Sequence, residues 1–291
     1  MSDPSLLNDA DIRGLVARAE AAAEHESRLN ILFQDIPLEI YGLLQFVGRP
    51  AGRLGNLLPR TPTEAEQIKW TGTHGAQMVT VASSYIKSML AHASFLSGKP
   101  ATEMVFLDHG CGWGRIPRFL SRFLAAEQIH GFDPMAESIA ICQRDNVPGT
   151  FRQCDPYPES LPADAGQTFD LINVFSVFTH LNEAYQFKVL EALRAYIAPK
   201  GVLAATIRRD TFWNTPRFDA ATRESMIRQH RSTGFAHLVG GNLGTRDKTA
   251  FFGETSTSID YVRERWKGWT LVATDISIAQ PSQIVLFLQR S

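Results

Sequence analysis

The sequence predicts an α/β fold, with a largely parallel sheet covered by helices on both faces. From residue 103 onward, apolar runs that suit buried strands alternate with amphipathic segments of helical spacing. The segments between these runs are long enough for the helical crossovers that parallel strands require. The first run, residues 105–107, leads into a turn with glycine at every second position, which is typical of a ligand-binding loop between a strand and a helix.

The first hundred residues lack this alternation and predict a helical region. A helix is expected over 9–33, where apolar residues recur at helical spacing after Asp9 or Asp11 as the N-cap. Residues 48–63 are rich in glycine, proline and arginine and predict a loop. A second helix is expected over about 75–95, which has a continuous apolar face. We therefore expect residues 1–100 to form a helical cap or lid region beside a second domain, residues 101–291.

The elements of this second domain follow from the local pattern. Strands are expected at 104–108, 129–133, 149–154, 169–175 and 201–207, with helices near 115–125, 135–145 and 182–197. Residues 208–256 break the rhythm and predict an insertion after the fifth strand. A helix is expected at 257–266. The last two strands, 270–276 and 283–288, are too close together for a crossover, so they predict antiparallel neighbours.

Composition narrows the classes of function. The chain has 291 residues and a net charge of −1, so no global field favours nucleic acid, and no nucleic-acid partner is expected. It has three cysteines, no Cys-x-x-Cys and no histidine pair at zinc-ligand spacing, so neither a disulfide framework nor a metal is expected. We see no signal peptide and no apolar run of about 20 residues, and we expect no membrane span and a cytoplasmic location.

The glycine turn distinguishes between two kinds of cofactor. A dinucleotide fold needs Gly-x-Gly-x-x-Gly, whereas the glycines here are Gly110, Gly112 and Gly114, so that the third is one place early. Asp108 precedes the turn, where it would repel a pyrophosphate and suit an ammonium-bearing ligand. Asp133 ends the second strand, as expected of a carboxylate that accepts both ribose hydroxyls, and it fits either cofactor.

With these motifs, the chain closely resembles class I S-adenosylmethionine-dependent methyltransferases over about residues 100–208, and more loosely over 255–290. The marks in order are Leu-Asp-His-Gly-Cys-Gly-Trp-Gly-Arg at 107–115, Gly-Phe-Asp at 131–133, Cys-Asp at 154–155, Phe-Asp-Leu-Ile-Asn at 169–173, Ser-Val-Phe-Thr-His-Leu at 176–181 and Ala-Pro-Lys-Gly at 198–201. The resemblance implies a Rossmann-like, doubly wound, seven-stranded sheet and S-adenosyl-L-methionine as the cofactor. The Cys-Gly-Trp-Gly-Arg form is similar to bacterial members that often modify sugars, surface glycans or small metabolites.

The resemblance also assigns residues to the methionine part of the cofactor. Gly110, Gly112 and the backbone around Cys111 would line it, with Gly114 completing the turn. Asp108 would orient the amino group, directly or through water. An alternative remains open, because Asp108 is also placed to cap the next helix.

For the nucleoside part, the resemblance implies that Asp133 binds the ribose hydroxyls. Asp155 would accept from the adenine amino group, with the Cys154 region packed on the ring. Asn173 and Phe175 would lie near the amino-acid moiety and the methyl group. Here too an alternative is open, because Asp155 precedes a proline and suits a turn.

The cysteines and histidines call for separate interpretations. Cys111 and Cys154 have no activating base nearby in sequence and are interpreted as packing residues rather than nucleophiles. His180, just past the fourth strand, is the first candidate for a general base, and the alternative is a histidine that orients its loop. His74, in a segment that could fold over the cofactor as a lid, is the second candidate, with a helix-start role as its alternative.

The predicted function is metal-independent methyl transfer to a hydroxyl of a small metabolite, sugar or glycan. No Asn-Pro-Pro-Tyr or Asp-Pro-Pro-Tyr run follows the fourth strand, so the resemblance does not extend to methyltransferases of DNA amino groups. Alternatives are N-methylation of an amino sugar or peptide, and a non-catalytic protein that binds the cofactor. A nicotinamide dehydrogenase is disfavoured by the glycine spacing. The sequence names neither the acceptor nor the oligomeric state.

Overall fold

The computed structural model describes residues 3–240, 251–277 and 279–291. The chain divides into two compact units, residues 1–94 with 99–153 and residues 95–98 with 154–291, and each is described by itself. The predicted boundary near residue 100 stays a prediction.

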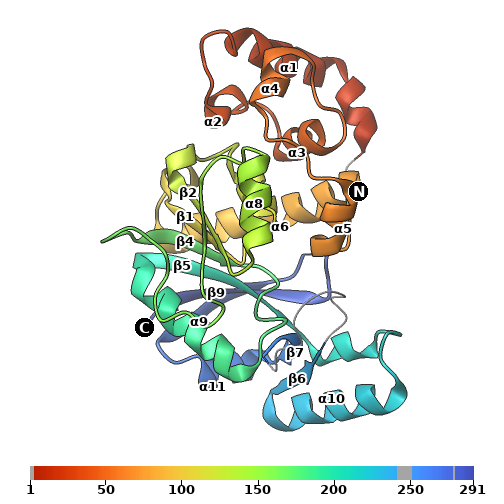
Figure 1. The fold of residues 1–291 in the computed structure, drawn as a ribbon, viewed down its shortest axis with the longest axis vertical. Coiled ribbons are helices and arrows are strands. Elements are labelled where there is room, and N and C mark those ends of the chain that lie inside the picture. The colour runs from red at the N-terminus through yellow and green to blue at the C-terminus, as the bar shows by residue number, and fades with distance from the viewer. Residues whose placement is uncertain (1–2, 241–250, 278) are drawn as a thin grey trace. The chain divides into compact units, whose positions relative to one another are not determined.

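The first unit begins with a helical region that matches the predicted class of structure but not every predicted boundary (Figure 1). Its α-helices are α1 (Ala10–Ala22), α2 (Leu29–Leu32), α3 (Leu38–Phe46), α4 (Gly52–Leu57), α5 (Glu64–Thr71) and α6 (Gly75–Ser97). Asp9 caps α1, and Thr63 and Glu66 form a capping box on α5. The predicted helix over 75–95 is therefore confirmed as α6.

Two predictions in this region are wrong. The helix expected over 9–33 is broken after Ala22, because the Glu26 carboxylate accepts the backbone N–H groups of Ser27 and Arg28 and turns the chain before α2. The segment 48–63 is not all loop, since it contains α4. The first backbone N–H groups of α4 are satisfied by Glu20 of α1, which accepts from Arg53 at 2.8 Å and from Leu54 at 3.0 Å.

Three parallel strands complete the first unit. They are β1 (Phe106–His109), β2 (Ile129–Asp133) and β3 (Thr150–Gln153), with Asp108 opposite Gly131 and Gly131 opposite Phe151. The helices α7 (Arg115–Leu120) and α8 (Ala136–Arg144) follow β1 and β2. Every residue of β1 and β2 is buried, as expected for strands inside a covered parallel sheet.

The second unit holds the remaining strands of the sheet. Strands β4 (Phe169–Val174) and β5 (Ile197–Arg208) are parallel, and α9 (Glu183–Tyr196) connects them. The helix α11 (Ile259–Arg265) leads to β8 (Trp269–Asp275) and β9 (Gln283–Arg290), which are antiparallel to each other as predicted, and β9 is also antiparallel to β5. The seven-stranded sheet has the order β3-β2-β1-β4-β5-β9-β8, which confirms the predicted fold class.

The predicted insertion has a structure of its own within the second unit. It contains the 3-10 helix η4 (Asp210–Asn214), α10 (Ala220–Thr233) and a two-stranded antiparallel sheet of β6 (Phe235–Val239) and β7 (Gly253–Thr257), and α10 packs against β6 (Figure 1). The backbone N–H of Gly253 donates to the carbonyl of His180 at 2.8 Å, and that of Thr255 donates to the carbonyl of Thr179 at 2.9 Å. The insertion is thus joined by backbone hydrogen bonds to the segment that follows β4.

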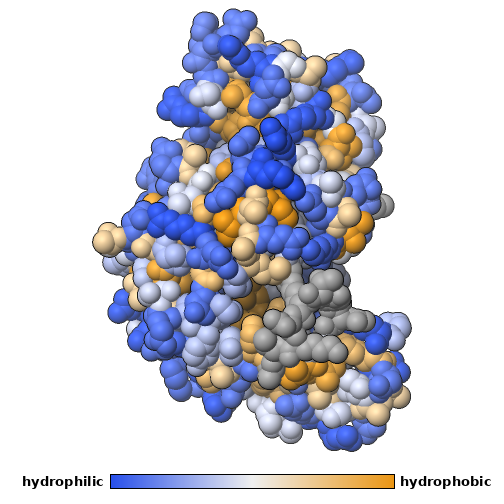
Figure 2. Space-filling view, viewed as in Figure 1, coloured by the Kyte–Doolittle hydropathy of each residue, from blue (hydrophilic) through white to orange (hydrophobic). Residues whose placement is uncertain are grey.

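The surface in Figure 2 is mostly hydrophilic, with hydrophobic side chains in small separate patches. Among the described residues, we find no helix that combines the length and apolar character needed to cross a bilayer.

Candidate functional site

The glycine turn after β1 is held in left-handed backbone conformations. Gly110, Gly112 and Gly114 have φ values of 78°, 55° and 78°, which disfavour residues with a side chain. The N–H groups of Gly110 and Cys111 both donate to the carbonyl of Phe132 on the adjacent strand, at 2.7 and 3.2 Å. The turn is therefore fixed by the backbone of β2 rather than by its own side chains.

Asp133 is fixed by the same turn. One carboxylate oxygen accepts the N–H of Gly112 at 2.8 Å, and the other accepts the N–H of Met135 at 2.9 Å. The side chain is buried, and a carboxylate has about four lone-pair sites, so these two bonds orient it and leave capacity for further donors. A methyl group added at Gly112 would meet no atom within 4 Å, so open space lies beside the turn.

The neighbourhood of Asp108 contains a cation of the protein itself. Asp108 is buried on β1, and Arg115 opens α7 just beyond the turn. Burial lowers the pKa of Arg115 to about 10, and the negative charge of Asp108 opposes that shift. Any ammonium group that Asp108 attracts would therefore bind near the positive charge of Arg115.

Cys111 has the surroundings of a packing residue. It lies in a cluster with Ile139, Cys142 and Val147, and burial raises the pKa of its thiol well above the ordinary range. A thiol held protonated in an apolar cluster is a poor nucleophile, which supports its interpretation as a packing residue. His109, the last residue of β1, is also buried, and burial lowers its pKa to about 4.

In the second unit, the chain leaves β4 through a constrained turn. Asn173 is fully buried near the end of the strand, and Ser176 has a φ of 57°, which is uncommon for a residue with a side chain. The N–H of Ser176 donates to the hydroxyl of Thr206, and its own hydroxyl accepts from the amide of Gln283 at 2.7 Å. These bonds hold the segment after Phe175 at the carboxyl ends of β4 and β5.

Cys154 and Asp155 differ in their exposure. Cys154 is buried, whereas Asp155 is exposed and accepts the N–H of Tyr157 at 2.7 Å. This bond from two residues along is the geometry of an Asx turn, which was the alternative left open for Asp155. The predicted contact of Asp155 with adenine stays a prediction.

His180 takes part in hydrogen bonds through both ring nitrogens. Its Nδ1 lies 2.8 Å from the carbonyl oxygen of Gly253, and its Nε2 lies 3.1 Å from Nη2 of Arg208. Because a carbonyl only accepts and a guanidinium only donates, Nδ1 carries the proton and Nε2 is the acceptor. The ring also stacks on Phe252, with centroids 5.2 Å apart. In this arrangement the lone pair that a general base would use is occupied, which favours the alternative role of orienting the loop.

Glu254 is the central residue of this network, and the sequence analysis missed it. Its side chain is 3% exposed, and one carboxylate oxygen pairs with Arg208. The other oxygen lies 3.1 Å from Nη2 of Arg217. Burial lowers the pKa of Arg208, against the attraction of Glu254. No local signal could have identified Glu254, because its partners come from distant positions in the chain.

His74 lies in the first unit, immediately before α6. Its side chain is 45% exposed, and its Nδ1 is 3.5 Å from the carboxylate of Glu64. This is the setting of a residue at the start of a helix, and its catalytic role stays a prediction.

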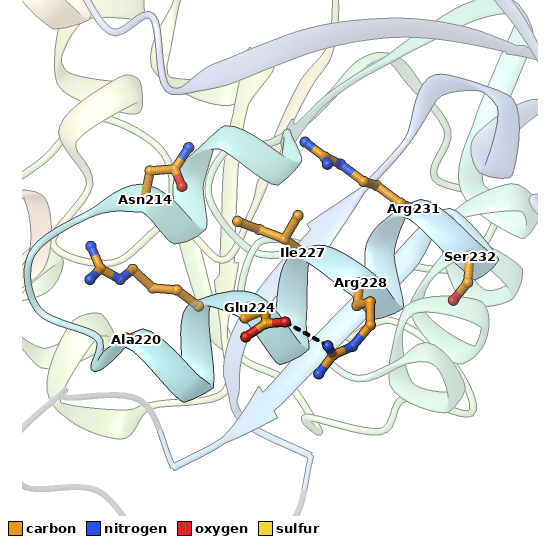
Figure 3. A pocket seen from close by; sticks show the side chains of 8 residues that line it. Asn214, Ala220, Glu224, Ile227, Arg228, Arg231 and Ser232 are labelled. Atoms are coloured by element: carbon orange, nitrogen blue, oxygen red, sulfur yellow. Dashed lines mark hydrogen bonds and ion pairs between the residues drawn. The ribbon is translucent and has the colours of Figure 1, made fainter.

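A surface hollow lies elsewhere in the insertion. This hollow has a volume of about 660 Å³ and is lined by residues of α10 and by Asn214. Figure 3 shows the lining side chains. Glu224 and Arg228, which form an ion pair at 2.8 Å, belong to its wall. None of the predicted site residues lines it.

Comparisons with known proteins bear on this site. Residues 106–201 match a family described as a methyltransferase domain. No sequence among the curated proteins matches the chain. A solved structure titled "DhpI-SAH complex structure" is 15% identical, covers 87% of this chain and 95% of its own, and has a TM-score of 0.51. A glycopeptide N-methyltransferase, MtfA, complexed with sinefungin is 12% identical, with coverages of 70% and 86% and a TM-score of 0.47.

The domain match spans β1 to the middle of β5, and therefore includes the glycine turn, Asp133 and the end of β4. The likeness to the first solved structure shows a shared fold. The predicted enzyme class is confirmed at this level, while the Cys-Gly-Trp-Gly-Arg subtype stays a prediction. Residues 106–201 of this chain are thus similar to a methyltransferase domain, and the sheet to which they contribute has a Rossmann-like fold.

Proposed function

We propose that this chain transfers a methyl group from S-adenosyl-L-methionine to a hydroxyl of a small molecule, sugar or glycan. The observation that carries the proposal is the pairing of the left-handed glycine turn with Asp133 inside a methyltransferase domain. The turn leaves open space beside Gly112, and the carboxylate beside it is pre-oriented by two backbone N–H groups. Because the Asp133 carboxylate is already oriented, it can accept hydrogen bonds from hydroxyl groups without a large loss of side-chain entropy on binding.

The residues of the first unit fit this cofactor. Asp133 would accept the ribose hydroxyls, and Gly110, Cys111 and Gly112 would present backbone to the methionine part. Asp108 would attract the amino group. When bound, the cofactor supplies an activated methyl group on a sulfonium, so the protein mainly positions the acceptor and excludes water.

The second unit supplies the remaining assignments, which rest on the resemblance. They give Asp155, Asn173 and Phe175 contacts with the cofactor, and they stay predictions. His180 stays a candidate base for the acceptor hydroxyl, a role that requires Arg208 to release Nε2. N-methylation of an amino sugar or peptide stays an alternative. The cytoplasmic location stays a prediction.

The experiment that tests the proposal is calorimetric titration of the full chain. We expect micromolar binding of S-adenosylmethionine and S-adenosylhomocysteine and none of NAD. Charge-assisted hydrogen bonds contribute roughly 1.5–3 kcal/mol, so Asp133→Asn should weaken binding by about tenfold or more. Asp35→Asn, which changes an exposed carboxylate of the first unit, is the matched control. Binding of NAD alone, or unchanged affinity in the Asp133 variant, would contradict the assignment. Binding without turnover on a broad acceptor panel would favour a non-catalytic role.

A further inference from the structure

Counted over the described residues, the charge network around Glu254 carries more positive than negative charge. Arg208 and Arg217 both pair with the single carboxylate of Glu254. His180 adds no charge, because its Nε2 accepts from Arg208 and must therefore be unprotonated. The Arg208 and Glu254 side chains are 11% and 3% exposed and pair with each other, so the excess positive charge falls on Arg217, which is 39% exposed. A positive charge at the partly exposed end of a buried ion pair attracts a counter-charge from solution.

Arg217 has the donors to bind that counter-charge. Among the described residues, only its Nη2 has an ion-pair or hydrogen-bond partner, which is Glu254. Its guanidinium carbon lies 4.8 Å from the centre of the Phe212 ring and 4.7 Å from that of Phe218. The two rings, which lie at 70° to each other, pack against the guanidinium without accepting its remaining N–H groups in conventional hydrogen bonds, so these donors are left for a ligand. At 39% side-chain exposure, Arg217 is also reachable from solvent.

A second observation at the same edge points to a missing ligand. Gln283 is the register partner of Arg208 on the neighbouring strand β9, and it is 6% exposed. Its amide nitrogen donates to Ser176, but its Oε1 is buried and has no hydrogen-bond partner among the described residues. A buried acceptor without a donor is uncommon in native proteins. Both features lie at the carboxyl ends of β4 and β5, the edge at which such sheets bind ligands.

We propose that Arg217 binds an oxyanion group of the methyl acceptor, with Arg208 supplying a second positive charge and Glu254 holding the two guanidinium groups in place. This inference rests on the proposed methyl transfer, because it describes the substrate of that reaction. The acceptor is then a small molecule that carries a carboxylate or a phosphate-type group besides the group that receives the methyl. Arginine suits this task because its forked donors match the oxygens of both anions.

The test uses inorganic phosphate and acetate as probes, titrated into the full chain at an ionic strength held constant with sodium chloride. We expect one of them to bind at millimolar concentration, and Arg217→Gln to weaken that binding by about tenfold or more. Arg223→Gln removes the same charge from α10, outside the network, and should bind the probe as the unaltered protein does. Preference for phosphate or for acetate identifies the kind of oxyanion. Absence of binding to the unaltered protein, or equal binding by the Arg217 variant, overturns the inference.

Glu254→Gln provides a second route that does not depend on the folding of the Arg217 variant. It removes the carboxylate that, in the described part of the chain, pairs with both arginines. The change should therefore lower the melting temperature, and phosphate should restore more of that loss than sodium chloride of equal ionic strength. Equal effects of the two salts would overturn the inference. Titration of S-adenosylmethionine into the same proteins separates the two proposals. Binding of the cofactor without the oxyanion removes only this inference, and binding of the oxyanion without the cofactor removes the proposed function.

Discussion

Mild acid should destabilise the protein through His109, the last residue of β1. Its imidazole is 4% exposed, and its Nδ1 has no hydrogen-bond partner in the described part of the chain. Burial lowers the pKa of His109 to about 4, from an ordinary value of 6.5. Between these values the unfolded chain binds a proton that the folded chain does not. The free energy of unfolding therefore rises with pH across this range. The contribution of the neutral His109 is fully present above about pH 6.5 and is lost as the pH falls toward about 4.

The two pKa values of His109 set the size of this effect. At about pH 5, most unfolded chains and few folded chains carry the proton, which removes about 2 kcal/mol of the free energy of unfolding present at about pH 7.5. Natural domains have roughly 5–15 kcal/mol in total, so the loss is readily measured. The contribution should level off below about pH 4, where the folded protein also binds the proton.

Urea unfolding at several pH values measures this contribution of His109. His109→Phe keeps an aromatic ring and cannot titrate, so it should lose about 2 kcal/mol less than the unaltered protein between about pH 7.5 and about pH 5. His25→Phe, at an exposed position after α1, controls for the removal of any one histidine. Parallel pH profiles for the His109 variant and the unaltered protein would show that His109 does not cause the loss of stability in acid.

Three further changes test other parts of the structure. Arg118→Met should cost about 3 kcal/mol in urea unfolding, because it breaks a buried ion pair and leaves Asp145 short of a partner; a loss similar to that of a surface substitution would contradict this. Gly112→Ala should weaken S-adenosylmethionine binding in calorimetry by about tenfold. Gly98→Ala is the control, because Gly98 also has a positive φ and no atom within 4 Å of an added methyl group. Both changes should cost about 1 kcal/mol of stability, but Gly98→Ala should leave the affinity unchanged. His180→Ala should lower turnover with cofactor affinity unchanged, and full activity in a methyl-transfer assay would remove His180 from both of its considered roles.

The parallel strands could be predicted because their signal is local. The run that leads through the start of β1, residues 104–107, is wholly apolar, and every residue of β1 and β2 is buried. The helical N-terminal region was harder to predict because one of its determinants lies far away in sequence. Glu20 satisfies the first N–H groups of α4 from more than thirty residues away, at Arg53 and Leu54. A Gly-rich segment with no cap of its own therefore predicted a loop where a short helix forms.

The candidate site divides in the same way. The turn and Asp133 could be proposed from the sequence because the glycine spacing predicts a turn, and the carboxylate directly follows a predicted strand. His180 was recognised as a titratable residue near the end of β4, but its tautomer depends on Gly253, which is 73 residues further on. The sequence could therefore name the histidine without saying whether its lone pair is available.

Whether a functional residue can be predicted thus depends on where its partners lie. Asp133 takes donors from Gly112 and Met135, and both belong to the strand-and-turn motif that identifies it. Glu254 takes its partners Arg208 and Arg217 from earlier positions in the chain, and the residues that follow it, 255–258, are small and polar and carry no motif. A motif therefore locates the part of the site whose residues are neighbours in sequence, whereas a network of distant charges leaves no local pattern and becomes visible only in the folded structure. This is why residues could be assigned to the cofactor from the sequence, whereas the pairing of Arg208 and Arg217 with Glu254 is seen only in the structure.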